Sequence, residues 1–280
     1  MILDSVRIVA DSSGDLMGPK RIPFASAALK ICTAEKEYVD DENLDVKQMV
    51  DDLGSYKGKS STSCPNVSDW LEAFGDAQHV FCVTITSSLS GSYNSAMLAK
   101  KSYMEDHPDR KVHVVNSLST GPEMYLIIEK LEELIIGGAE FEQVAEETEK
   151  YCKNTGLLFM LQSMKNLANN GRVSHIAAKM AGILGIRALG KASDKGELEM
   201  LEKCRGEKRS LEAIIEHMKK LGYKCGKVRI AHCFNESFAE SLKGKLCELF
   251  KSIDVMVYSC RGLCSFYAET GGILVGFEKA

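Results

Sequence analysis

The feature that most constrains this chain is the stretch 79–96, HVFCVTITSSLSGSYNSA, where an apolar run stops at a hydroxyl-rich turn. Residues 80–85 are mostly apolar or β-branched, which is typical of a buried strand. From Ser92 onward the spacing of small and apolar residues predicts a helix. A strand–turn–helix of this kind brings free backbone N–H groups and the positive end of a helix dipole together. It predicts an anion site, and the alternative is a serine that only caps an ordinary helix.

The composition of this turn indicates which kind of anion would suit it. It has one glycine and no lysine, so it is neither a G-x-x-x-x-G-K-[ST] loop nor a G-x-G-x-x-G loop. The G-x-S-x-G motif of a nucleophile elbow is also missing. Hydroxyls are neutral donors, which suit one small carboxylate better than a triphosphate with its magnesium. Ser90, Gly91 and Ser92 are therefore the candidate ligand-binding residues of this turn.

Two other apolar runs end in hydroxyl-rich turns. Residues 6–10 lead into DSSGD, and residues 111–115 lead into NSLSTG, which contains the further candidate Ser117. Helices predicted over 123–136 and 140–152 follow, so strands alternate with helices as in a parallel sheet. Because the carboxyl ends of parallel strands meet at one edge, we expect the three turns to converge there and form a binding site.

The chain of 280 residues is long enough for two domains. We predict an α/β fold with an N-terminal parallel-sheet domain over 1–154, an α+β domain over 155–280, and a ligand site between them. Residues 59–66 are predicted to be a polar loop. The small and apolar residues 175–184 predict a helix that either packs in a core or lines a ligand tunnel.

Charge, hydropathy and cysteine spacing argue against several classes of protein. The net charge of -4 is spread over the chain, without the basic face that nucleic-acid binding requires. No uncharged apolar run reaches the length of a membrane span and the first residues do not form a signal peptide, so we expect a cytoplasmic protein without stable membrane insertion. The ten cysteines form no C-x-x-C pair, and we expect free thiols and no metal.

Six short motifs resemble those of the DegV family, in the same order along nearly the whole chain. They are DSS at 11–13, TSCP at 62–65, LSG at 89–91, NSLS at 116–119, GRVS at 171–174 and EKCRG at 202–206. The resemblance implies a two-domain protein that holds a long-chain fatty acid between its domains. In some bacteria such proteins present the carboxyl group to a fatty acid kinase, which makes an acyl phosphate.

The resemblance also implies roles for individual residues. Thr62 and Ser90 match the positions at which the family contacts the carboxylate. Arg172 would lie near that carboxylate or face a partner's phosphates, and the alternative is an arginine that caps a loop or covers the domain interface. Apart from the resemblance, Arg205 belongs to a local basic cluster with Lys203, Lys208 and Arg209, which predicts either a solvated surface or a docking site for an acidic partner. Tyr267 falls where the family commonly has histidine, and a phenol donates a hydrogen bond but gains no positive charge near neutral pH.

Three functions follow from these observations. The first is a fatty-acid carrier with no catalytic residue, no metal and no cofactor other than its bound fatty acid. The second is an acyl hydrolase or transferase that uses Ser90 as the nucleophile, although no histidine accompanies Ser90 in the sequence. The third is a phosphate- or nucleotide-binding module, which rests on the α/β architecture alone.

Overall fold

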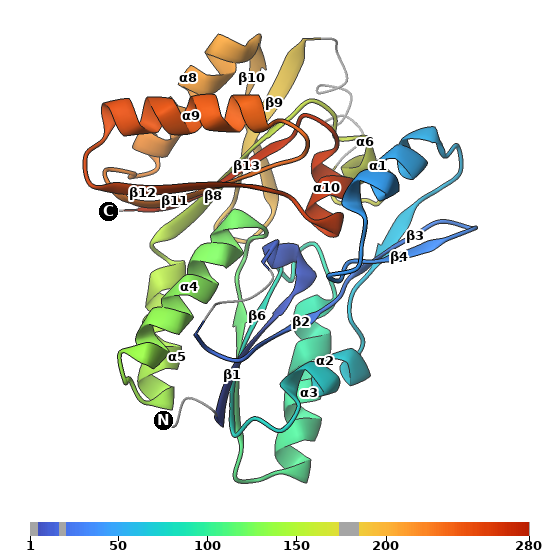
Figure 1. Ribbon diagram of the computed structural model, residues 1–280, viewed down its shortest axis with the longest axis vertical. Helices are drawn as coiled ribbons and strands as arrows, with labels where there is room; N and C mark the ends of the chain where they lie inside the picture. Colours follow the sequence, from blue (N-terminus) through green and yellow to red (C-terminus); the bar gives the residue numbers. More distant parts are fainter. Residues whose placement is uncertain (1–4, 17–20, 174–184, 280) are drawn as a thin grey trace.

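The computed structural model describes residues 5–16, 21–173 and 185–279. Two sheet-based domains lie one above the other, the first drawn in blue to green and the second in yellow to red (Figure 1). The predicted fold class, a parallel-sheet α/β domain followed by an α+β domain, is confirmed. The division at residues 154 and 155 stays a prediction, and the helix predicted over 175–184 lies outside the described residues.

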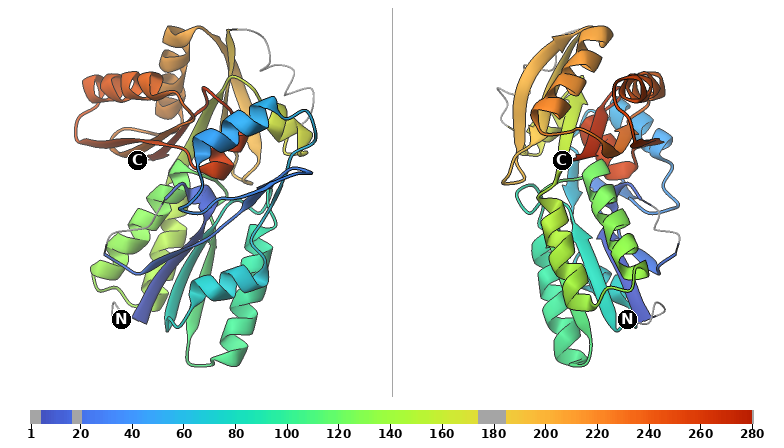
Figure 2. Two further views of the ribbon diagram at one scale, coloured as in Figure 1. Left: turned by 45° about the vertical axis from the view of Figure 1, so that its right-hand side comes forward. Right: turned by 90° about the vertical axis from the view of Figure 1, so that its left-hand side faces the viewer.

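The N-terminal domain is built on a four-stranded parallel sheet of order β2-β1-β6-β7. Helices α2 and α3 cover one face of this sheet, and α4 and α5 cover the other (Figures 1 and 2). These elements are β1 (Val6–Asp11), β2 (Phe24–Ala27), β6 (His79–Thr84), β7 (Lys111–Asn116), α2 (Val67–Phe74), α3 (Ser92–Asp106), α4 (Pro122–Ile136) and α5 (Phe141–Cys152).

The three hydroxyl-rich turns do meet at the carboxyl edge of this sheet, as the sequence predicts. The backbone N–H of Gly121 donates to the carbonyl of Ser13 at 2.7 Å, and that of Thr86 donates to the carbonyl of Ser119 at 2.9 Å. The 3-10 turn η2 (Ser12–Gly14) follows β1 and packs against α4. The edge of the sheet is therefore a connected structure, held together largely by its own backbone.

A small second sheet of order β4-β3-β5 extends from this domain toward helix α10 (Gly262–Ala268), beside helix α1 (Figure 1). Its elements are β3 (Lys30–Cys32), β4 (Glu37–Val39), β5 (Ser61–Ser63) and α1 (Val46–Ser55). The prediction of a loop over 59–66 is wrong at β5, where Thr62 lies opposite Ile31 in an antiparallel ladder. Three polar residues carry no hydrophobic alternation, so only pairing with β3 makes them a strand.

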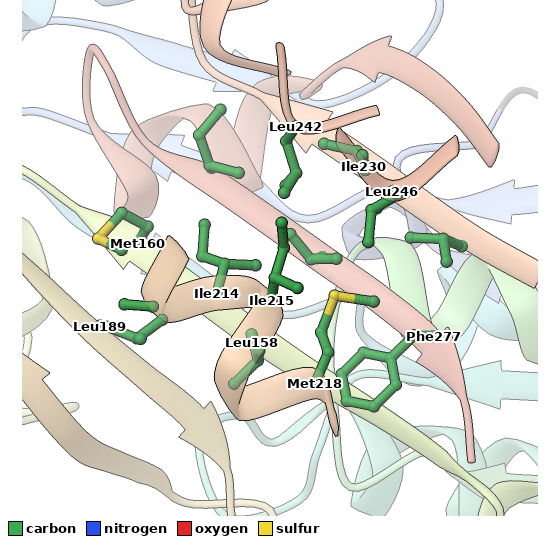
Figure 3. Packing of buried hydrophobic residues seen from close by; sticks show 14 of the residues in the cluster. Leu158, Met160, Leu189, Ile214, Ile215, Met218, Ile230, Leu242, Leu246 and Phe277 are labelled. Atoms are coloured by element: carbon green, nitrogen blue, oxygen red, sulfur yellow. The ribbon is translucent and has the colours of Figure 1, made fainter. Parts of the chain in front are cut away.

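The C-terminal domain has a six-stranded mixed sheet of order β10-β9-β8-β13-β11-β12. Its strands are β8 (Thr155–Leu161), β9 (Ile186–Ala192), β10 (Leu198–Arg205), β11 (Gly226–His232), β12 (Ile253–Ser259) and β13 (Ile273–Glu278). Helices α8 (Glu207–Lys220) and α9 (Glu236–Leu249) cover one face and bury the core shown in Figure 3. The short helices α6 (Lys165–Asn169) and α10 (Gly262–Ala268) lie toward the other face (Figure 1).

Helix α4 joins the two domains, since it packs on the parallel sheet and also against β11 and β13. Arg229 of β11 is buried at this junction, and two of its N–H groups donate to the Glu129 carboxylate of α4, each at 2.9 Å. A third bond, at 2.8 Å, reaches Asp254 of β12. A buried guanidinium is tolerated only with such partners, so this cluster defines how the domains face each other.

Candidate ligand-binding site

A cavity of about 300 Å³ lies between the two domains, and most of the side chains that line it are apolar. Its polar side chains include Thr62 and Ser90 from the first domain and Arg172 and Tyr267 from the second. They form two pairs, since Tyr267 bonds Thr62 and Arg172 bonds the backbone beside Ser90, and the positive charge of Arg172 acts to lower the pKa of Tyr267. The remaining lining residues are Leu29, Ser63, Cys64, Ile85, Leu89, Gly91, Thr120, Leu157, Phe159, Leu161, Leu167, Leu198, Leu263, Cys264, Ala268 and Leu274.

Thr62 and Tyr267 connect the small sheet with α10 across the domain interface. Their hydroxyl oxygens are 2.7 Å apart, and either oxygen can be the donor. Burial raises the pKa of the Tyr267 phenol, so it stays neutral near pH 7. One hydroxyl hydrogen of the pair is used in this bond, and the other remains free to be donated to a ligand oxygen.

Ser90 and Gly91 form the entrance to α3, with Gly91 at its N-cap position. The Ser90 hydroxyl oxygen accepts the backbone N–H of Ser92 at 3.2 Å, and both Ser90 and Gly91 line the cavity. A side chain at position 91 would bring its Cβ within 3.2 Å of the Cys64 sulfur. Glycine therefore lets the turn before α3 approach Cys64, which directly follows β5.

Ser92 and Ser117, both predicted to bind ligand, lie elsewhere. The Ser92 hydroxyl is buried and donates to Asp11 at 2.6 Å. The Ser117 hydroxyl donates to the carbonyl of Ser119 at 3.1 Å, and neither serine lines the cavity. Both hydroxyls serve the turns themselves, so we do not include these two residues in the proposed ligand contacts.

Arg172 follows α6, in a turn where Gly171 has a φ of 73°, a left-handed conformation that favours glycine. Its Nε–H donates to the carbonyl of Leu89 at 3.2 Å, and Nη1 donates to the carbonyl of Asn170. The guanidinium thus lies beside the Ser90 turn and lines the cavity. Arg205, by contrast, is exposed at the end of β10. These placements leave the ligand role of Arg172 and the docking role of Arg205 as proposals.

Two buried carboxylates of the first domain hold the start of α10, which carries Tyr267. Asp40 accepts the N–H groups of Gly262 at 2.8 Å and Leu263 at 2.9 Å. Asp15 accepts the N–H of Arg261 at 2.8 Å, and its second oxygen has no hydrogen-bond partner among the described residues. These contacts join segments more than two hundred residues apart.

The roles of Asp11, Asp15 and Asp40 were not predicted from the sequence. A signal existed for the first two, because DSSGD places an aspartate directly after a buried strand and another at the end of the turn. Carboxylates at such positions commonly bond nearby backbone N–H groups. No local signal exists for Asp40, whose partners lie on another domain.

All ten cysteines fall within the described residues, and each carries a free thiol. Burial raises the pKa of the Cys233, Cys260 and Cys264 thiols, which makes them poor nucleophiles near neutral pH. Within the described ranges, no group of three or more His, Cys, Asp and Glu side chains is arranged to hold a metal ion. No helix in the same ranges is long and apolar enough to cross a membrane.

Asp15 provides a test of the contacts at α10, because burial raises the pKa of its carboxyl to about 7. Because the folded-state pKa lies above that of the unfolded chain, the contribution of this carboxyl to stability is greatest below about pH 4 and is lost as pH rises toward 7. Asp15→Asn should remove this part of the decline. The unfolding free energies of the parent protein and of Asp15→Asn should therefore diverge by up to about 1.4 kcal/mol per pH unit between pH 4 and 7. Urea unfolding at several pH values measures the difference.

The matched control for this experiment is Asp109→Asn, which changes an exposed carboxyl. It should leave the pH dependence of the unfolding free energy as it is in the parent protein. Parallel curves for the parent protein and Asp15→Asn would contradict the prediction.

Comparisons with known proteins agree with this geometry. The family model described as an uncharacterised protein of the DegV family matches residues 5–279. A DegV domain-containing protein of Streptococcus pneumoniae is 43% identical over an alignment of 279 residues. The match covers 97% of this chain and 98% of that protein. Among solved structures, a DegV family protein of Eubacterium eligens loaded with heptadecanoic acid matches with a TM-score of 0.97 and 43% identity, over 98% of this chain and 100% of that one.

A second solved structure has a similar match. It is the fatty acid kinase B3 protein of Streptococcus pneumoniae loaded with linoleic acid, with a TM-score of 0.96 and 43% identity, over 98% of this chain and 99% of that one. Sequence, fold and cavity thus lead to the same assignment: this chain belongs to the DegV family.

Proposed function

We propose that this protein is a carrier that holds one long-chain fatty acid in the cavity between its domains and presents the carboxyl group to a fatty acid kinase. The observation that carries the proposal is a mostly apolar cavity in which Thr62, Ser90, Tyr267 and Arg172 are among the few polar residues of the lining. Two relatives of the same fold and 43% identity are loaded with fatty acids, and one of them is a fatty acid kinase protein.

Energetics indicate what each part of the cavity contributes. Burying about fifteen methylenes at about 0.8 kcal/mol each stabilises the complex by on the order of 12 kcal/mol before the costs of association. One hydrogen bond to a charged carboxylate adds about 1.5–3 kcal/mol. The tail therefore supplies most of the affinity, and the hydroxyls mainly determine which end of the fatty acid lies at the Ser90 turn.

The two arginines suit a protein that hands its ligand to a kinase. Arg172 borders the cavity beside the Ser90 turn, and its planar N–H groups match the oxygens of a carboxylate or a phosphate. We propose that it faces the headgroup, and that the exposed Arg205 contacts the kinase. The ten free thiols suit a reducing compartment, which supports a cytoplasmic location.

An acyl hydrolase that uses Ser90 has less support. The described lining of the cavity includes no histidine, aspartate or glutamate that could act as a general base for Ser90. The Ser90 oxygen also accepts the N–H of Ser92, an arrangement that belongs to a helix entrance. A nucleotide-binding module is disfavoured by the apolar lining, since phosphates need polar surroundings.

The first test of the proposal identifies the ligand that the protein retains during purification. We expect lipid extraction and mass spectrometry to find a long-chain fatty acid in near-stoichiometric amount. Recovery of a nucleotide, or of no lipid from a protein that also fails to bind added fatty acid, would contradict the proposal.

Ser90→Ala tests whether the Ser90 hydroxyl contacts the headgroup. Losing one hydrogen bond to the carboxylate should weaken the binding of a long-chain fatty acid about tenfold, for a loss near 1.4 kcal/mol. The fatty alcohol of the same length offers no carboxylate, so its affinity should fall much less on Ser90→Ala. Equilibrium binding of both ligands gives the comparison, and an equal loss for both would show that Ser90 does not contact the carboxylate.

Tyr267 tests the other side of the headgroup site. Tyr267→Phe removes the hydrogen bond to Thr62 and should weaken fatty-acid binding by a few-fold, in line with about 1 kcal/mol for a neutral hydrogen bond. Tyr267→His should instead make the affinity depend on pH, with tighter binding below about pH 6.5, where an imidazolium attracts the carboxylate. Fluorescence titrations across this range would reveal the effect, and a pH-independent His variant would argue against this position of the carboxylate.

A further inference from the structure

The sheet face that borders the cavity has an uneven distribution of side-chain sizes. Leu157, Phe159 and Leu161 of β8 all line the cavity. On the neighbouring strand β9, Ala188 pairs with Leu161 and Gly190 pairs with Phe159. Opposite residues of an antiparallel pair share a face, so β9 presents almost no side chain beside the large residues of β8.

Phe159 takes up the space that Gly190 leaves. A Cβ built at position 190 would lie 2.2 Å from Cζ and 2.5 Å from Cε2 of the Phe159 ring, closer than any real Cβ contact. The ring therefore leans across β9, in the way that aromatic rings cover glycines on neighbouring strands. On the other side of Phe159, the opposite residue of β13 is Leu274, which also lines the cavity.

The position of this ring affects the space available to a ligand. Phe159 is 2% exposed and is a wall of the cavity, so its ring is in contact with the interior on one side and with the backbone of Gly190 on the other. Any larger residue at position 190 would drive the ring away from β9. Any smaller residue at position 159 would enlarge the cavity above β9.

We propose that Phe159 and Gly190, whose backbone packs against the Phe159 ring, together determine which acyl chain lengths the cavity accepts. The residues proposed to bind the headgroup do not contact this pair through hydrogen bonds. Thr62 bonds Tyr267, Ser90 bonds the backbone of Ser92, and Arg172 bonds the backbone of Leu89 and Asn170. The inference rests on the proposed fatty-acid carrier function and adds the residues that select among fatty acids. Headgroup binding and chain selection are thereby separate properties of the site.

Phe159→Leu is the main test, with affinities measured for a homologous series of saturated fatty acids. The enlarged cavity should favour longer acids, because each further methylene that it buries improves the affinity about fourfold. For two acids that differ by one methylene, the affinity of the longer relative to the shorter should therefore be about fourfold or more higher in Phe159→Leu than in the parent protein. The affinity lost on Ser90→Ala should be the same in the Phe159→Leu background, since the headgroup contacts are unchanged.

Phe277→Leu is the matched control. Phe277 is a fully buried phenylalanine of the same sheet, but it points into the core beneath α8 and α9 (Figure 3). The same substitution there should lower stability and leave the chain-length profile unchanged. A shift that occurs equally in both variants would overturn the proposal, because it would reflect general loosening of the domain.

Gly190→Ala tests the pair from the opposite side. The added Cβ should displace the ring into the cavity and move the preference toward shorter acids, and Gly190→Ala combined with Phe159→Leu should restore longer ones. This Cβ would also lie 2.6 Å from the carbonyl oxygen of Glu199, so the variant can fail to fold. In that event Phe159→Leu alone decides the outcome.

The carrier function and the role of Phe159 and Gly190 are contradicted by different results. If the parent protein binds no fatty acid, the proposed carrier function is wrong. If the parent protein binds fatty acids and Phe159→Leu has the same chain-length profile, the carrier function stands and the role of Phe159 and Gly190 is wrong.

Discussion

The candidate site depends on one buried carboxylate, that of Asp11 at the end of β1. Its oxygens accept the backbone N–H groups of Ser13 and Ile85 and the hydroxyls of Ser13 and Ser92. Burial raises the pKa of this carboxyl, and these four donors oppose that rise. Asp11 thus joins its own turn to the end of β6 and the start of α3. The Ser90–Gly91 turn lies between those two points, so its position follows from the carboxylate.

The same physical arrangement recurs where the second domain contributes to the site. Asp40 and Asp15 bind the backbone N–H groups at the start of α10, and Phe266 of α10 packs into the small core formed by the three-stranded sheet and α1. Tyr267 follows Phe266 directly, so its hydroxyl is brought to Thr62 by contacts made several residues away. Buried carboxylates that do not line the cavity therefore position the groups proposed to bind the ligand.

Much of the framework could be predicted from the sequence because it rests on local patterns. The β-branched runs that became β1, β6 and β7, and the helical spacing of α4, are visible in short windows. The convergence of the turns followed from the geometry of parallel strands. The residues that were not predicted depend on distant partners. β5 exists only because it pairs with β3, and Asp40 has a role only because Gly262 and Leu263 lie against it.

The hydroxyls of the turns show a second limit of sequence reasoning. Ser90 and Ser92 are two residues apart in the same turn, yet one lines the cavity and the other donates to Asp11. Composition predicts that a turn is rich in donors. It does not show which donors the protein itself uses, because that depends on where Asp11 lies relative to the turn. The distinction appears only when every donor is assigned its acceptor.

The polar residues and the apolar walls of this site tolerate substitution differently. The four residues proposed to bind the headgroup are Thr62 and Ser90 from one domain and Tyr267 and Arg172 from the other, so a change in domain packing alters the distances between these two pairs. The apolar walls contribute through buried area, which tolerates exchange of one hydrophobic side chain for another of similar volume. A change at Phe159 is therefore expected to alter the space for the acyl chain, whereas a change at the carboxylates that hold α3 and α10 would disturb the proposed headgroup site.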